Sequence, residues 1–94
     1  IIVVNNGEGN IFRIIPGPSN TNAVDEFIAT KHHKNVENLA KHFGFSYFKV
    51  EEEETFLRVL DNFFKADEKP KILEIDTSEI QNADVLKNYF NALK

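Results

Sequence analysis

The sequence predicts an α/β fold in which half of an open parallel sheet is flanked by helices. Short runs typical of strands alternate along the 94 residues with segments of helical periodicity. Such alternation is typical of parallel strands joined by helical crossovers. The composition, 41% hydrophobic and 28% charged, is that of an ordinary globular chain. There is no internal repeat and no low-complexity segment.

The first third of the chain predicts one strand followed by irregular structure. Residues 1–5 form a continuous apolar run, which indicates an interior parallel strand buried on both faces. Residues 6–10, rich in Asn and Gly, predict a turn. Residues 11–15 are too short to classify by periodicity. A loop is expected over 19–34, with one helical turn around 24–28.

The middle of the chain predicts a helix and then a strand. Apolar residues in the helix follow the spacing i, i+3, i+4, i+7, at Val36, Leu39, Ala40 and Phe43. Asn35 is expected to be the N-cap of this helix and Gly44 its C-terminal stop. Residues 45–50 are rich in aromatic side chains and predict the strand.

Two further helices and a strand complete the pattern. Glu51–Glu54 places negative charge at the start of a helix. Its expected apolar face consists of Phe56, Leu57, Leu60, Phe63 and Phe64. A third strand is expected over 72–75. The last helix is expected to begin at the N-cap Asn82, with an apolar face made of Val85, Leu86, Tyr89, Phe90 and Leu93.

Charge and composition argue against several classes of function. With 15 acidic and 11 basic residues the net charge is −4, which argues against a nucleic-acid-binding surface. No stretch approaches the roughly 20 apolar residues that span a bilayer. The absence of cysteine excludes disulfides and thiolate chemistry and favours a reducing compartment, so we expect a cytoplasmic location. Because the chain begins within a core-like strand and lacks Met, we interpret it as a piece of a larger protein.

The end of the first strand is the place where chemistry is expected. Ligands of open parallel sheets bind beyond the carboxyl ends of the strands, and this strand delivers Asn5 to Asn10 to that edge. An Asn side-chain oxygen and a backbone carbonyl two residues later are hard donors that suit Mg²⁺. Glycines allow a diphosphate to approach the backbone. An ordinary Asn-Gly turn after a strand remains the alternative.

Residues 3–16 resemble the closing half of the thiamin diphosphate motif. The stretch Val-Val-Asn-Asn-Gly-Glu-Gly-Asn-Ile-Phe, followed by Ile15-Pro16, is similar in particular to the menaquinone-pathway synthases of the thiamin diphosphate-dependent family. The resemblance implies that residues 1–94 are the C-terminal part of a pyrophosphate-binding domain. The Gly-Asp-Gly that opens the motif lies outside this chain.

The resemblance also implies a set of binding residues. Asn6 would bind Mg²⁺ (or Mn²⁺) through its side chain, and Glu8 through its backbone carbonyl. Many relatives have Gly at the position of Glu8, whose carboxylate is unfavourable beside a diphosphate unless it points away. The cofactor contacts would come from Asn6, Gly7, Gly9, Asn10 and Ile11, and the substrate contacts from Phe12 and Ile15. Core packing is the alternative role of the last two residues.

The activity that the resemblance implies is that of a thiamin diphosphate-dependent transferase. Such an enzyme decarboxylates 2-oxoglutarate and adds the resulting carbanion to isochorismate. The cofactor would lie between this domain and a second subunit, and no catalytic residue is expected within this chain. The chain alone is therefore expected to be inactive and to bind the cofactor weakly or not at all.

Two alternative functions and the role of Arg13 remain open at this point. Another thiamin diphosphate enzyme, such as an acetolactate synthase or a 2-oxo acid decarboxylase, would share the motif. A non-catalytic α/β interaction module would have the Asn-Asn turn as a turn only. Arg13 could meet a substrate carboxylate, but a surface ion pair is the favoured interpretation.

Overall fold

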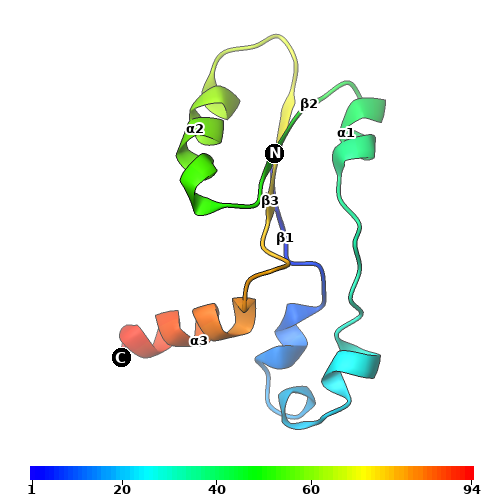
Figure 1. The fold of residues 1–94 in the computed structure, drawn as a ribbon, viewed down its shortest axis with the longest axis vertical. Coiled ribbons are helices and arrows are strands. Elements are labelled where there is room, and N and C mark those ends of the chain that lie inside the picture. Colours follow the sequence, from blue (N-terminus) through cyan, green and yellow to red (C-terminus); the bar gives the residue numbers. More distant parts are fainter. The chain divides into compact units, whose positions relative to one another are not determined.

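The computed structural model describes all residues from 1 to 94 and divides them into two compact units. The sheet unit contains residues 1–5 and 34–77, and the turn unit contains residues 6–33 and 78–94. Figure 1 shows the elements of each unit. The expected α/β class is confirmed. No helix has the length and apolar character needed to cross a membrane.

The sheet unit is built on three parallel strands in the order β1-β3-β2. The strands are β1 (Ile2–Asn5), β2 (Ser46–Val50) and β3 (Lys71–Asp76). Two helices, α1 (Glu37–His42) and α2 (Glu53–Phe64), lie on either side of the strands (Figure 1). The alternation of strands and helices expected from the sequence is therefore confirmed in this unit.

The apolar core of the sheet unit lies between β2, β3 and α2. Val50, Phe63 and Leu73 are buried together. Half-buried side chains from the same elements pack around them, namely Phe48, Phe56, Val59, Leu60 and Ile75. Because strand side chains alternate between faces, Leu73 and Ile75 point to this core and Glu74 points to the other face.

Several details of the sheet unit differ from the sequence prediction. Within residues 1–94 the central strand is β3 and β1 pairs with β3 alone, whereas the sequence predicted β1 as an interior strand. Ile2 and Val4 of β1 are 51% and 66% exposed. On α2, Leu57 and Phe64 are exposed rather than part of the apolar face. The helix turns them away from β2 and β3, and Val59 takes a place in the core instead.

Asn35 is wrong as the N-cap of α1: the helix begins at Glu37, so Val36 holds the N-cap position and Asn35 precedes it. The Asn35 side-chain oxygen accepts a hydrogen bond from the Glu37 amide at 3.1 Å. Gly44 follows the helix with a positive φ of 74°, the left-handed conformation that ends many helices.

The turn unit contains three short helical turns and the helix α3 (Asn82–Ala92). The turns are 3₁₀ helices over Asn10–Arg13 and Pro18–Asn20 and a π-helical turn over Val24–Ile28. The last of these confirms the helical turn expected there. Asn82 is wrong as the N-cap of α3: it is the first residue of the helix, and its side chain donates to the Ile80 carbonyl. The apolar side chains expected along α3 are largely exposed in this chain.

Candidate cofactor site

The turn unit encloses an open pocket of about 690 Å³, within the range of small-molecule sites. Every residue that lines the pocket belongs to the turn unit. Four of the predicted site residues meet there, namely Asn6, Gly7, Glu8 and Asn10. The other four, Gly9, Ile11, Phe12 and Ile15, lie outside its lining.

Asn6 begins the turn with a local hydrogen bond. Its side-chain oxygen accepts from the Glu8 amide at 3.2 Å, a bond between residues two apart that is typical of an Asx turn. A carbonyl-type oxygen has a second lone pair, so Asn6 Oδ1 keeps the capacity to bind a cation. No group of three or more His, Cys, Asp and Glu side chains is placed to hold a metal ion.

Gly7 is buried in the wall of the pocket with a φ of +71°. Its carbonyl accepts a hydrogen bond from the His32 amide at 2.8 Å, which holds the turn against the end of the following loop. A Cβ atom at this position would lie 3.0 Å from Ser78 Cβ. Both the backbone conformation and the close contact therefore require glycine here.

Asn10 supplies the observation that best fits a bound polar group. It is 8% exposed, and its side-chain Oδ1 is buried with no hydrogen-bond partner. An unpaired buried oxygen costs free energy of about 1–3 kcal/mol, so buried polar atoms in folded proteins are nearly always paired. Asn10 also lines the pocket, but its Oδ1 is closed off from solvent, so a ligand in the pocket would reach this atom only after the side chain moves.

Glu8 and Arg13 form an ion pair in the wall of the same pocket. Arg13 Nε lies 2.5 Å from Glu8 Oε1, and Arg13 Nη2 lies 2.9 Å from Glu8 Oε2. Arg13 Nη2 also donates to Asp25 Oδ1 at 2.7 Å. Hydrogen bonding to Arg13 lowers the pKa of Glu8 below its ordinary value of 4.5. Arg13 is thus engaged in an ion pair, as favoured from the sequence, and the Glu8 carboxylate is neutralised.

Gly9 and Phe12 are packed against one another. A Cβ at Gly9 would lie 3.0 Å from the Phe12 ring, so this glycine makes room for the ring. The Gly9 amide donates to the Ala29 carbonyl at 2.6 Å and is already engaged. The amides of Asn10 and Ile11 begin the 3₁₀ turn and have no acceptor within it.

The residues whose contacts hold this turn in place were not predicted from the sequence. Ala29, His32 and Ser78 contact the turn through backbone atoms or Cβ. Such contacts leave no residue-type signal. Asp25 could have been paired with Arg13 only once the loop between them was known to fold back.

The chain was compared with known proteins, and no protein-family model matches it. It is 39% identical over 99% of its residues to the 2-succinyl-5-enolpyruvyl-6-hydroxy-3-cyclohexene-1-carboxylate synthase of Flavobacterium johnsoniae. Proteins of the same name from Christiangramia forsetii and Porphyromonas gingivalis are each 37% identical, over 100% and 96% of the chain. The chain spans only 17%, 16% and 16% of the length of these three relatives. The resemblance expected from residues 3–16 is thereby confirmed: over nearly its whole length, this chain is similar to one segment of the 2-succinyl-5-enolpyruvyl-6-hydroxy-3-cyclohexene-1-carboxylate synthases.

Proposed function

We propose that residues 1–94 are the C-terminal part of the pyrophosphate-binding domain of a thiamin diphosphate-dependent synthase. The full-length protein would be a transferase of menaquinone biosynthesis (MenD) that uses 2-oxoglutarate and isochorismate. The similarity to the three synthases over 96–100% of the chain carries this proposal. The pocket that contains Asn6, Gly7, Glu8 and Asn10 supports it independently of the names of the relatives.

The metal-binding part of the proposal rests on two oxygens. Asn6 Oδ1 and the backbone carbonyl of Glu8 would bind Mg²⁺ or Mn²⁺, both of which prefer oxygen ligands. The hydrogen bond from the Glu8 amide to Asn6 Oδ1 holds these two residues in one tight turn. A carboxylate from another part of the full-length protein would complete the protein ligands.

The remaining predicted residues would hold the cofactor and the substrate. Around the diphosphate, Gly7 and Gly9 would shape the turn, and Asn10 and Ile11 would offer their amides. Asn10 Oδ1, which is buried and unpaired, would gain a partner once its side chain turned toward the ligand. Phe12 and Ile15 would form the apolar wall beside the substrate. When bound, thiamin diphosphate would supply the carbanion chemistry that decarboxylation of a 2-oxo acid requires.

Charge in the pocket supports a divalent cation as a partner of the diphosphate. Of the three Lys and Arg side chains that line the pocket, Arg13 and Lys31 form ion pairs with Asp25. They are therefore not free to neutralise a diphosphate by themselves. The cation would bear most of that role, with residues of a second subunit closing the site in the cytoplasmic enzyme.

The test is a turnover assay of the full-length protein with thiamin diphosphate and Mg²⁺. Consumption of 2-oxoglutarate that depends on isochorismate is the expected result, with pyruvate as the control substrate. Turnover of pyruvate would keep the cofactor and overturn the substrate, in favour of an acetolactate synthase or decarboxylase. No turnover and no bound cofactor would overturn the proposal and leave a non-catalytic interaction module.

A further inference from the structure

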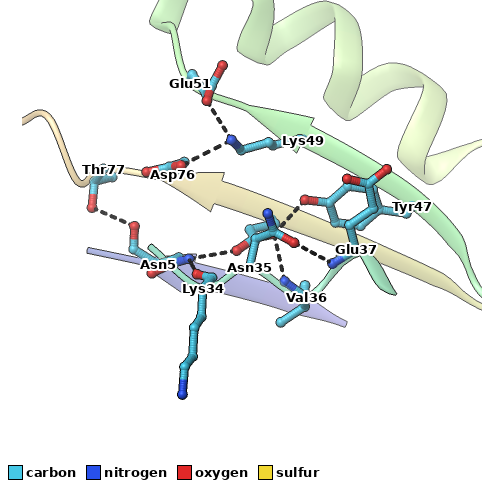
Figure 2. A network of polar contacts seen from close by, with 11 residues as sticks. Asn5, Lys34, Asn35, Val36, Glu37, Tyr47, Lys49, Glu51, Asp76 and Thr77 are labelled. Atoms are coloured by element: carbon cyan, nitrogen blue, oxygen red, sulfur yellow. Dashed lines mark hydrogen bonds and ion pairs between the residues drawn. The ribbon is translucent and has the colours of Figure 1, made fainter. Parts of the chain in front are cut away.

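A fully buried carboxylate lies on the face of β3 opposite the apolar core. No part of Glu74 is exposed. Its Oε1 accepts a hydrogen bond from Asn5 Nδ2 at 2.8 Å. Its Oε2 accepts from the Tyr47 hydroxyl at 2.5 Å and from the Val36 amide at 3.1 Å. Figure 2 labels the three donor residues, which come from β1, β2 and the residue before α1.

Asn5 connects this carboxylate to the segments that leave the sheet unit. The same Asn5 Nδ2 that donates to Glu74 also donates to the Lys34 carbonyl at 2.8 Å. Asn5 and Lys34 are the two residues of the sheet unit that flank residues 6–33 in the chain. One side chain therefore ties together the two ends of the segment that carries every predicted binding residue.

The start of the second segment outside the sheet unit, residues 78–94, is also held by a hydrogen bond to Asn5. Thr77 is the last residue of the sheet unit before residues 78–94. Its amide donates to the Asn5 carbonyl at 2.8 Å. Its hydroxyl donates to the same carbonyl at 3.5 Å (Figure 2). The chain passes between the units after Asn5, before Lys34 and after Thr77. Asn5 is hydrogen-bonded to both of the other two residues.

The chemistry of the partners makes a carboxylate necessary at position 74. The Lys34 carbonyl can only accept, so the Asn5 side chain must present its NH₂ group to it. The second hydrogen of that NH₂ group then points at Glu74, which must accept. Val36 and Tyr47 also donate to Glu74. A glutamine would place its own NH₂ against one of these donors and leave a buried group unpaired.

We propose that Glu74 is a positioning residue for the turn of residues 6–10, which carries the proposed metal ligands, and that it acts through Asn5. Glu74 fixes the Asn5 side chain, which in turn holds the two ends of residues 6–33 together. The position of the Asn5 backbone then determines where the chain enters Asn6. A segment whose ends are already held loses less conformational freedom when a ligand binds. The inference rests on the proposed function, and its expected consequence is on cofactor affinity rather than on the chemical step.

The test compares three variants of the full-length protein. Glu74→Gln and Asn5→Ala both break the link between the carboxylate and the ends of the segment. Tyr47→Phe is the matched control, because it removes one hydrogen bond to the same carboxylate and leaves Asn5 untouched. Binding of thiamin diphosphate at fixed Mg²⁺ is measured by calorimetry, and kcat is measured at saturating cofactor.

We expect Glu74→Gln and Asn5→Ala to weaken cofactor binding about tenfold, the effect of losing one charge-assisted hydrogen bond. Saturating cofactor restores kcat to within about threefold, and Tyr47→Phe changes the affinity by less than about twofold. The Asn5→Ala variant decides the matter alone if Glu74→Gln does not fold, since Asn5 is only half-buried.

Two results would overturn the inference while leaving the proposed function intact. One is unchanged cofactor affinity in Glu74→Gln and Asn5→Ala; the other is an equal loss in Tyr47→Phe, which would make Glu74 a general structural residue. The unsubstituted protein serves as the reference sample, and it could itself fail to bind thiamin diphosphate. That result would overturn the proposed function and the inference together.

Discussion

The Arg13 guanidinium makes a two-point ion pair with the Glu8 carboxylate, at 2.5 and 2.9 Å. Glu8 is the one acidic residue of the turn over 6–10. An unpaired carboxylate there would repel a diphosphate. The positive charge of Arg13 offsets the negative charge of the Glu8 carboxylate and so removes most of this repulsion. Two-point pairing also keeps the carboxylate turned toward Arg13.

Removal of Arg13 is expected to weaken cofactor binding through Glu8. In the full-length protein, Arg13→Gln should weaken thiamin diphosphate binding about tenfold, because the Glu8 charge is then unpaired. The double variant Glu8→Gln/Arg13→Gln should recover most of the loss, as measured by calorimetry. A double variant as weak as Arg13→Gln alone would show that Arg13 acts on the ligand directly.

Gly7 is expected to be intolerant of a side chain for two separable reasons. Gly7→Ala and Gly44→Ala both force alanine into a left-handed conformation, at a cost of about 1–2 kcal/mol each. Only at Gly7 does the new Cβ also meet a neighbour, at 3.0 Å from Ser78 Cβ, since no atom lies within 4 Å of a Cβ at Gly44.

Thermal unfolding and cofactor binding of the full-length protein separate these two effects. Both variants should lower the melting temperature, and Gly7→Ala should lower it further. Only Gly7→Ala should weaken thiamin diphosphate binding. Equal cofactor affinities in the two variants would contradict a role for the turn at Gly7.

The hydroxyl of Tyr47 is expected to resist ionisation. Burial, followed by its hydrogen bond to Glu74, raises the pKa of Tyr47 well above the ordinary value of 10.0. Since the pKa is raised in the folded state, the resulting stabilisation is complete below pH 10.0 and is lost as the pH rises from there through the folded-state pKa.

A difference titration tests this shift. The phenolate absorbance of the folded full-length protein is compared with that of its Tyr47→Phe variant across the alkaline range. The two titrations should coincide through pH 10.0, where an ordinary tyrosine is half ionised. An additional step in the unsubstituted protein at that pH would show that Tyr47 is not shielded.

The sequence was sufficient to predict the elements that are defined by local pattern. The strands β2 and β3 and the helices α1, α2 and α3 all occur where periodicity indicated them. Gly44 ends α1 as expected because its effect depends on neighbours within a few residues. The turn of residues 6–10 was predictable for the same reason.

Features that depend on distant partners were not predictable. An apolar run such as residues 1–5 suits either a central or an edge strand, so the pairing of β1 with β3 rather than with β2 depends on the strand order. Glu74 stands between Leu73 and Ile75, where a charged residue normally indicates the solvent-facing side of a strand. It is buried because its donors come from Asn5, Val36 and Tyr47, which are 27 to 69 residues away.

The most direct test of the account is Mg²⁺-dependent binding of thiamin diphosphate by the full-length protein and its Asn6→Ala variant. Asn35→Ala is the matched control, because it removes an asparagine side chain of the sheet unit whose oxygen accepts a hydrogen bond from the Glu37 amide. We expect the unsubstituted protein and Asn35→Ala to bind the cofactor with similar affinity. Asn6→Ala should lose at least about tenfold in affinity along with its dependence on Mg²⁺. Unchanged, Mg²⁺-dependent binding by Asn6→Ala would contradict the assignment of this turn as the cofactor site.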